Sequence, residues 1–287
     1  MKRVGFIGVG IMGKSMVRNL MKAGYEVSIY TRTKSKVEDV IGEGAGWCDS
    51  VAECARGRDV VITIVGYPKD VEEVYFGEKG ILANADKGAY VIDMTTTSPR
   101  LAVRIYEEAS KVGLHAIDAP VTGGDSGAKA GTLTILAGGE KKDFDACIPV
   151  FEAMGKNINY EGKAGNGQHT KMCNQIAIAG ALAGACEAFV YAKNVGLDLE
   201  TCFASISTGA AGSAQMSNVA SKALKDNFDP GFFLKHFIKD MSIASEEAKE
   251  ANAQLEILEK VLSMCKELEA DGMGDLGTQA LIRHYNW

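Results

Sequence analysis

A glycine-rich turn near the start of the chain has the spacing of a phosphate-binding site. Gly8, Gly10 and Gly13 form a GxGxxG pattern directly after a short strand-like segment and at the start of an amphipathic stretch. The first glycine permits a tight turn, the second lets a pyrophosphate approach the backbone, and the third lets helix and strand pack closely. Backbone N–H groups at the helix N-terminus then face the anion. The alternative is an ordinary glycine-rich turn, but strand, turn and helix occur in the required order, so we predict a dinucleotide site.

The residues after the second strand-like segment indicate which nicotinamide cofactor binds. An acidic residue there usually contacts the ribose hydroxyls of NAD, and an arginine accommodates the 2′-phosphate of NADP. The sequence has Thr31-Arg32-Thr33, with Lys36 shortly beyond and no Asp or Glu at this place. Arg32 can pair with a phosphate bidentately and Thr33 can donate a hydroxyl. The alternative is a solvated basic loop. We therefore favour NADP over NAD.

Two later loops offer hydroxyl groups and backbone donors after strand-like segments. Thr96 lies in the segment 94–99, and Thr122, Gly123 and Gly124 close the segment 118–124. Open α/β sheets bind ligands at the carboxyl ends of their strands. Exposed N–H groups beside a hydroxyl suit a carboxylate, which needs several convergent donors. Either loop could also be ordinary turn chemistry, because Ser, Thr, Gly and Pro favour turns for local reasons.

Lys171 and Asn174 stand near the start of an apolar run, 172–191, whose only formal charge is Glu187. The run predicts a long buried helix that opens from a flexible glycine-rich turn, 162–167. Residues three apart lie on one face of a helix. An ammonium and an amide on one face of a buried helix require an explanation, because burying unpaired polar groups is costly.

The elements that position these residues predict an α/β fold in two parts. Strand-like and helical segments alternate at first, which favours a largely parallel, doubly wound Rossmann-type sheet over residues 1–162. Ser50 and Ser98 precede predicted helices as N-caps, and Pro99 follows Ser98 at the first helical position. Only helical segments follow, so we predict an all-helical substrate and oligomerisation domain over 163–287 that begins with a long interdomain helix. The predicted strands are 3–7, 26–30, 60–65, 90–94, 115–118, 133–137 and 157–160. The later predicted helices are 199–207, 213–225, 232–251, 254–270 and 278–285.

Composition excludes several classes of function. The chain has 287 residues and a net charge of −6 with no cluster of Lys or Arg, which argues against nucleic acid as a partner. The seven cysteines form no CxxC pair, so we predict neither a disulfide framework nor a metal site. The N-terminus has no signal-peptide pattern, and the apolar run is soon interrupted by Glu187. We therefore expect a cytoplasmic protein with no membrane role.

Four segments together carry a resemblance to a known family. They are GFIGVGIMG at 5–13, DAPVTGG at 118–124, GKAGNGQHTKMCNQ at 162–175 and FFLKHFIKDM at 232–241. In this order they closely resemble the signatures of the β-hydroxyacid dehydrogenase family, and the similarity covers nearly the whole chain. The family includes 3-hydroxyisobutyrate dehydrogenases, tartronate semialdehyde reductases and glyoxylate/succinic semialdehyde reductases.

The resemblance implies roles for individual residues. Lys171 would be the catalytic acid/base, and Asn174 would hold the substrate beside it. The implied substrate-binding residues are Thr122, Gly123, Gly124, Phe232, Lys239 and Asp240. The implied cofactor-binding residues are Gly8, Gly10, Ile11, Met12, Gly13, Thr31, Arg32, Thr33, Lys36, Val65, Thr96 and Lys239. Thr122 departs from the family, which more often has serine there, and its additional methyl narrows the predicted pocket.

A lysine suits the chemistry that such an enzyme needs. Hydride transfer to a carbonyl leaves an alkoxide that must gain a proton, and the nicotinamide cannot supply it. A lysine can do so when burial lowers its pKa from about 10.4 toward working pH. The alternative is a lysine that extends from a helix end to solvent. His169 is a rival base, but it faces elsewhere on the helix.

The Thr31-Arg32-Thr33 segment and the segment 234–241 also resemble those of NADP-dependent glyoxylate/succinic semialdehyde reductases. They favour a reductase that acts on a small aldehyde acid such as succinic semialdehyde or glyoxylate with NADPH in preference to NADH. A 3-hydroxyisobutyrate or tartronate semialdehyde dehydrogenase is the alternative. A cofactor-binding protein without catalysis and an imine reductase are less favoured, because Lys171 and Asn174 are both present. The small residues of the long helix favour close packing, and members of the resembled family commonly form dimers or tetramers. We therefore predict a homodimer or homotetramer.

Overall fold

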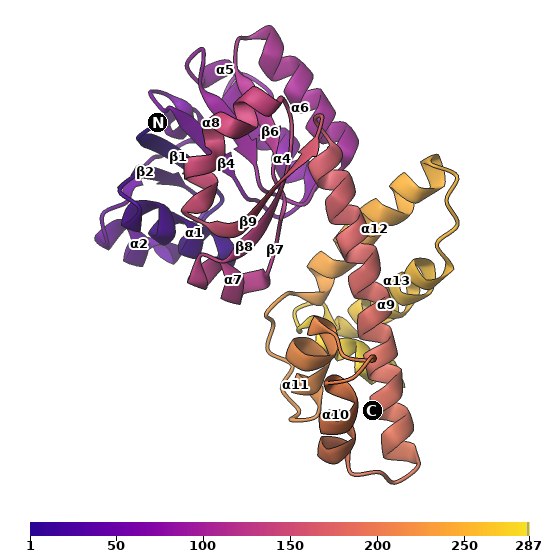
Figure 1. Cartoon of the computed structure of the whole chain (residues 1–287). Helices are drawn as coiled ribbons and strands as arrows, with labels where there is room; N and C mark the ends of the chain where they lie inside the picture. The colour runs from indigo at the N-terminus through magenta and orange to yellow at the C-terminus, as the bar shows by residue number, and fades with distance from the viewer. Residues whose placement is uncertain (286) are drawn as a thin grey trace. The chain divides into compact units, whose positions relative to one another are not determined.

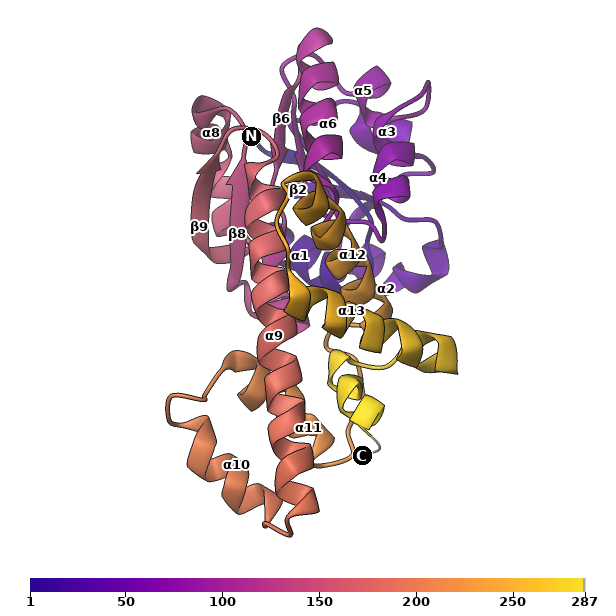
Figure 2. The ribbon, with the colours of Figure 1, turned by 90° about the vertical axis from the view of Figure 1, so that its right-hand side faces the viewer.

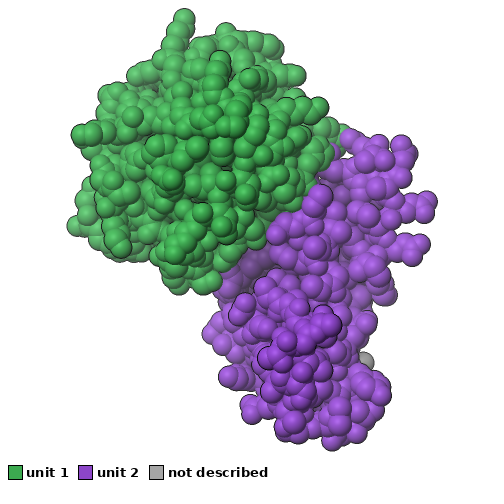
Figure 3. Space-filling view, viewed as in Figure 1, with its two compact units in different colours: residues 1–171 green, residues 172–287 purple. Residues whose placement is uncertain are grey.

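The computed structural model describes residues 1–285 and 287 and divides into two compact units, Met1–Lys171 and Met172–Trp287 (Figure 1 and Figure 3). The division falls inside the long helix α9 (Asn166–Asn194). The sequence places the domain boundary slightly earlier, at 162/163, where the chain leaves its last strand. The two units are described in turn.

Within the described residues, unit 1 is built on a nine-stranded sheet in the order β3-β2-β1-β4-β5-β6-β8-β7, with β9 paired to β8. Its strands are β1 (Arg3–Ile7), β2 (Glu26–Tyr30), β3 (Gly46–Trp47), β4 (Val60–Thr63), β5 (Tyr90–Asp93), β6 (His115–Asp118), β7 (Val121–Thr122), β8 (Leu133–Gly138) and β9 (Gly155–Gly162). The strands from β3 to β6 are parallel. β8 runs antiparallel to β6 and β7 and parallel to β9. The doubly wound Rossmann-type sheet is confirmed, with an antiparallel step that the alternating pattern does not predict.

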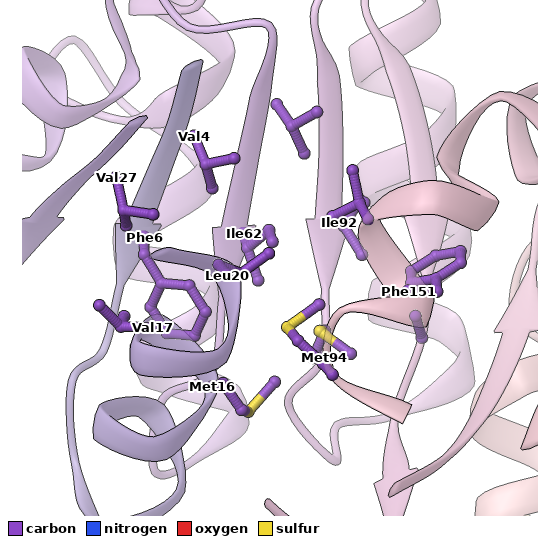
Figure 4. Close-up of a cluster of buried hydrophobic side chains, with 14 of the residues drawn as sticks. Val4, Phe6, Met16, Val17, Leu20, Val27, Ile62, Ile92, Met94 and Phe151 are labelled. Atoms are coloured by element: carbon purple, nitrogen blue, oxygen red, sulfur yellow. The ribbon is translucent and has the colours of Figure 1, made fainter. Parts of the chain in front are cut away.

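Helices cover both faces of this sheet (Figure 2). On one face lie α1 (Ile11–Lys22), α2 (Glu38–Gly42), α7 (Gly124–Ala130) and α8 (Lys141–Glu152), with the short turn η1 (Lys34–Lys36) before α2. On the other lie α3 (Val51–Ala55), α4 (Pro68–Tyr75), α5 (Ile81–Asn84) and α6 (Pro99–Lys111). Successive strand side chains point to opposite faces, so each strand contributes to both cores. Figure 4 shows the first core, where Phe6 and Ile62 lie beside Val17 and Leu20, and Phe151 lies near Ile92.

The predicted helix starts are confirmed by their capping bonds. The Ser50 hydroxyl accepts a hydrogen bond from the backbone N–H of Glu53 at 3.1 Å. The Ser98 hydroxyl accepts one from Leu101 at 3.2 Å, with Pro99 at the first helical position. Such caps satisfy donors that the helix itself leaves without partners. They fix where α3 and α6 begin after the preceding loops.

Unit 2 is helical, as predicted. It contains the larger part of α9, followed by α10 (Leu199–Ser207), η2 (Met216–Ala220), α11 (Ser221–Ala223), α12 (Leu234–Glu250), α13 (Glu256–Leu268), η3 (Glu269–Met273) and η4 (Thr278–Tyr285). Two predicted helices differ from expectation. The segment 213–225 forms short helical turns instead of one helix, and 278–285 is a 3₁₀ helix.

Helix α9 begins at Asn166, earlier than the apolar run predicts. Gly167 is therefore a helix residue and not part of a flexible turn; a Cβ there would lie 2.3 Å from the carbonyl oxygen of Leu136. The helix is also less buried than its apolar sequence predicts, because Phe189 is fully buried while Tyr191 is 67% exposed. By length and composition α9 could cross a membrane, but this is weak evidence because a core helix satisfies the same test.

Candidate active site

The glycine turn between β1 and α1 has the geometry of a dinucleotide cradle. Gly8 has a φ of +98°, and a Cβ there would lie 2.2 Å from the carbonyl oxygen of Ile64. A Cβ on Gly13 would lie 2.3 Å from the carbonyl oxygen of Gly8. At Gly10 no protein atom lies within 4 Å of the Cβ position. Two glycines thus permit close packing and the middle one leaves open space, which fits the approach of a pyrophosphate.

The ends of β4 and β5 lie beside this turn. The Cβ position of Gly8 is 3.0 Å from Val65 Cγ1. The backbone N–H of Val65 donates to the Thr95 hydroxyl at 2.9 Å, and the N–H of Thr95 donates to Asp93 Oδ1 at 3.1 Å. The structure therefore brings Val65 and the loop that carries Thr96 to the glycine turn. Ile11, 54% exposed, and Met12, partly buried against the core, begin α1 at the same place.

Arg32 follows β2, as predicted, and its side chain is 77% exposed. Its Nη1 lies 3.3 Å from Oδ1 of Asp70, a carboxylate that sequence reasoning did not include. The other oxygen of Asp70 accepts from the backbone N–H of Tyr67 at 3.0 Å, at the N-terminus of α4. Asp70 is thus held by the backbone at the start of α4, while the Arg32 side chain is accessible to solvent. Lys36, in the exposed turn η1, and Thr31 and Thr33 complete the predicted set in this loop.

The predicted carboxylate loop is part of a tight connection between β7 and α7. Thr122 ends β7, and Gly123 and Gly124 follow with φ values of +124° and +62°. Few other residues adopt this conformation, so both glycines are required by the backbone. The short helix α7 begins at Gly124, two residues after Thr122.

Two buried side chains of unit 1 fix the first turn of α9. Asp118, at the end of β6, accepts from the backbone N–H groups of Gly165 at 2.7 Å and Gln168 at 3.0 Å. The Gln168 side chain donates to the carbonyl oxygen of Thr95 at 2.8 Å and accepts from the N–H of Thr97 at 3.0 Å. The helix start is therefore tied to the loops after β5 and β6.

Burial raises the pKa of Asp118 to about 7. Desolvation is the largest cause, and the two backbone donors at the start of α9 oppose it because they stabilise the ionised form. Asp93, its register partner on β5, adds a raising effect through its negative charge. Asp118 therefore titrates near neutral pH.

Lys171 lies in the second turn of α9 and is only 6% exposed. A lysine is rarely this buried, because the cost of removing an ammonium from water is high. Asn174 follows three residues later and lies on the same side of the helix. The expected pair is therefore formed on a helix whose start is held by Asp118 and Gln168.

In unit 2 a chain of hydrogen bonds connects Asn174 to α12. Asn174 Nδ2 donates to Gln175 Oε1 at 2.7 Å, and Gln175 Nε2 donates to Asp240 Oδ2 at 2.6 Å. Lys239 Nζ lies 2.8 Å from Asp240 Oδ1. The structure thus brings three predicted residues together, with Gln175 as the connection that was not predicted.

Phe232 precedes α12 and is 38% exposed, with its ring 6.2 Å from that of Phe237. His236, one turn later, packs between Phe232 and Phe233. Burial and then the nearby positive charge of Lys239 lower the pKa of His236. His236 is therefore a neutral, partly buried ring near neutral pH.

Comparison with known proteins places this site in a family. Residues 3–162 match the family model described as the NAD-binding domain of 6-phosphogluconate dehydrogenase. Residues 165–285 match the one described as NAD-binding of NADP-dependent 3-hydroxyisobutyrate dehydrogenase. The chain belongs to the β-hydroxyacid dehydrogenase family. It is an NAD(P)-dependent oxidoreductase, and members of its family act on small carboxylate substrates.

Relatives span the whole chain. An uncharacterized oxidoreductase of Bacillus subtilis, YkwC, is 53% identical over 282 residues, 98% of each chain. A probable 3-hydroxyisobutyrate dehydrogenase-like protein of Arabidopsis thaliana is 44% identical and covers 98% of this chain and 84% of its own. Among solved structures, 3-hydroxyisobutyrate dehydrogenase of Mycobacterium tuberculosis with L-serine superposes with a TM-score of 0.91 at 29% identity, over 100% of both chains.

No role was predicted from sequence for four residues that the structure places in or beside the site of this β-hydroxyacid dehydrogenase: Asp70, Asp118, Gln168 and Gln175. Gln168 and Gln175 had a detectable signal, because their spacing of seven places them with Lys171 on one face of α9. A polar stripe inside an apolar run predicts buried hydrogen bonds. Asp70 had no such signal, because its contact with Arg32 joins residues far apart in the chain.

Within residues 1–285 and 287, no group of three or more His, Cys, Asp or Glu side chains is arranged to hold a metal ion.

Proposed function

We propose that this β-hydroxyacid dehydrogenase transfers a hydride between NADP(H) and a small hydroxyacid or aldehyde acid, such as succinic semialdehyde or glyoxylate. The observation that carries the proposal is the 6% exposure of Lys171 on a helix start fixed by Asp118 and Gln168. A lysine this buried suits proton transfer better than a structural role, because burying an ammonium is costly and a structural lysine could keep its ammonium in water.

The cofactor would be held by the glycine turn and the loops after β2, β4 and β5. Gly10 leaves room for the pyrophosphate, and Arg32 can reach a 2′-phosphate because its side chain is exposed. When bound, the nicotinamide supplies or accepts the hydride. A structure described as Psf3 in complex with NADP+ and 2-OPP is 26% identical with a TM-score of 0.90, which supports NADP in a related fold.

The residues of the chain supply the remaining chemistry. Lys171 Nζ would give a proton to the carbonyl oxygen during reduction and take it back during oxidation. Asn174 would orient the reacting oxygen, and the hydroxyl and N–H groups of Thr122, Gly123 and Gly124 would bind the substrate carboxylate. These roles assign acid/base chemistry and orientation of the reacting oxygen to α9, and binding of the carboxylate to the turn between β7 and α7.

Replacing Lys171 tests the mechanism. Lys171→Met keeps an unbranched side chain of similar length and removes the amine. We expect turnover to be abolished while NADPH still binds, measured by steady-state kinetics and by fluorescence titration. Lys163→Met is the matched control, because Lys163 is exposed on the approach to α9 and should keep wild-type kinetics. A Lys171→Met variant with near-wild-type kcat would refute the assignment.

A second candidate substrate class comes from the relatives. The Arabidopsis protein described above is named for 3-hydroxyisobutyrate, and a 32% identical protein of Escherichia coli is a 2-hydroxy-3-oxopropionate reductase. One methylene in a pocket changes discrimination by only about 1–3 kcal/mol. A panel of aldehydes and hydroxyacids, each assayed with NADPH and NADH, ranks the candidates by kcat/KM. Binding of NADPH without turnover of any member would favour a non-catalytic dinucleotide-binding protein. A cytoplasmic location and assembly as a dimer or tetramer stay predictions.

A further inference from the structure

The two middle members of the hydrogen-bonded chain from Asn174 to Lys239 are almost completely shielded from water, while Asn174 and Lys239 at its ends are partly exposed. Gln175 is 1% exposed and Asp240 is 2% exposed. The two donor–acceptor distances along the chain, 2.7 Å and 2.6 Å, are both short. Lys239 Nζ lies 2.8 Å from the second oxygen of Asp240. Buried networks of this kind are costly unless every member has its partner.

The carboxylate of Asp240, between Gln175 and Lys239, determines the orientation of both amides. A carboxylate only accepts hydrogen bonds, whereas an amide donates through nitrogen and accepts through oxygen. Gln175 must therefore turn its Nε2 toward Asp240, which leaves its Oε1 facing Asn174. Asn174 must in turn present its Nδ2 to that oxygen. Turning Gln175 around would place its oxygen against the carboxylate of Asp240, and turning Asn174 around alone would place its oxygen against that of Gln175.

We propose that Gln175 and Asp240 are positioning residues that fix the amide orientation of Asn174, so that its Oδ1 is the group offered to the reacting oxygen. The proposal rests on the proposed function, because it assumes that Asn174 orients the substrate. It assigns Asp240 an indirect action through Gln175 instead of the direct substrate contact that the sequence predicts.

The orientation has a chemical consequence. An amide oxygen accepts a hydrogen bond from a hydroxyl or an ammonium, and it cannot donate one to a carbonyl. Asn174 would therefore favour the alcohol form of the substrate, whose hydroxyl donates to Oδ1 while the same oxygen exchanges a proton with Lys171. An Asn174 in the opposite orientation would donate to the carbonyl and compete with the lysine for that oxygen.

Four variants separate this role from simple packing. Gln175→Met keeps the length of the side chain and removes both polar atoms. Gln175→Glu places two carboxylates in contact, and Asp240→Asn permits either amide orientation. The double variant Gln175→Glu with Asp240→Asn removes the contact between two carboxylates and keeps the orientation of Asn174, because the new glutamate accepts from Asn174 on one side and from the new asparagine on the other.

We expect kcat of Gln175→Met and Gln175→Glu to fall about 10- to 100-fold, the size of effect produced by misplacing a reacting group. The double variant should be at least about tenfold more active than Gln175→Glu, although a structural view predicts that two changes in one buried network are worse than one. Asp240 could instead act by holding Lys239, a predicted cofactor-binding residue. In that case the Kd for NADPH should rise equally in Asp240→Asn and in the double variant, because both lose the carboxylate that contacts Lys239.

The outcomes are distinguishable. A double variant no better than the product of the two single changes would overturn the proposal, as would wild-type kcat in Gln175→Met. If Gln175→Met does not fold, Asp240→Asn and the double variant still decide the question, because they carry two and one fewer buried carboxylates than Gln175→Glu, respectively. Lys171→Met, assayed in parallel, tests the proposed function itself: its inactivity together with unaffected Gln175 variants would remove only the positioning role.

Discussion

Gly10 and Gly13 of the cradle, three positions apart, should respond differently to the same substitution to alanine. Gly10→Ala places a methyl where no protein atom lies within 4 Å, on a backbone with φ of −83° that alanine adopts readily. The fold should tolerate it within about 0.5 kcal/mol. The methyl occupies the space that a pyrophosphate would approach, so the hydrogen bonds of the phosphate to backbone N–H groups should lengthen or break.

The expected loss of affinity follows from those bonds. A hydrogen bond to a charged group is worth about 1.5–3 kcal/mol, so loss of even one weakens NADPH binding by roughly 10- to 150-fold. Gly13→Ala differs, because its methyl would lie 2.3 Å from the carbonyl oxygen of Gly8, where ordinary contact begins at 3.4 Å. Helix α1 would have to retreat by about 1 Å, and overpacking of this kind costs about 1–3 kcal/mol.

The assay measures both properties on both variants. Thermal unfolding of the cofactor-free protein should show Gly10→Ala within about 2 °C of wild type and Gly13→Ala lower by roughly 3–12 °C, given the size of unit 1. Fluorescence titration gives the Kd for NADPH. Gly42→Ala is the matched control, because Gly42 ends α2 with open space around its Cβ position and lies outside the cradle. Wild-type NADPH affinity in Gly10→Ala would refute the cradle.

Two further predictions concern charged side chains of unit 1. Arg32→Gln should lower kcat/KM for NADPH about tenfold and leave kcat/KM for NADH nearly unchanged. The effect is near the lower limit for a hydrogen bond to a charged group, because Arg32 is exposed. Asp70→Asn should raise the preference for NADPH, because it releases Arg32 and removes a negative charge from the site of the 2′-phosphate. A wild-type enzyme that prefers NADH would contradict this. For Asp118, the pKa of about 7 in the folded protein lies above the value of about 3.9 in the unfolded chain. The protonated carboxyl therefore stabilises the fold fully below about pH 4. This contribution, up to about 4 kcal/mol, is lost as the pH rises to about 7. Asp118→Asn should therefore show a flatter dependence of Tm on pH over that window, whereas parallel curves would mean that the donors of Gly165 and Gln168 keep the carboxylate ionised.

Much of unit 1 was predictable because its signals are local. The glycine turn, the two serine caps and the long strands depend on residues within a few positions of one another. The strands β3 (Gly46–Trp47) and β7 (Val121–Thr122) were missed because two residues cannot show a period. The start of α9 was misplaced because Gly167 suggests a turn by propensity, while its close contacts with Leu136 and Asp118 require glycine inside the helix.

The residues of the site that could be predicted were also those with local sequence signals. Residues in contiguous motifs, such as Gly8 and Lys171, were identified from the sequence and its resemblance to the family. Contacts such as Arg32 with Asp70 were not, because nothing in either segment specifies that the two will meet. Hydrogen-bond partners that only the tertiary fold brings together can be identified from the three-dimensional structure but not from the sequence.

The polar face of α9 shows where sequence reasoning could have gone further. Gln168, Lys171 and Gln175 are 0%, 6% and 1% exposed, at spacings that put them on one face of the helix. Burying such groups is unfavourable unless each is paired, and apolar residues would pack there at lower cost. The two glutamines are fully bonded, one to the loop after β5 and one to α12. A helix needs such bonds on either side of a buried lysine only if the position of that lysine matters, so the stripe itself predicts a functional residue between two positioning ones.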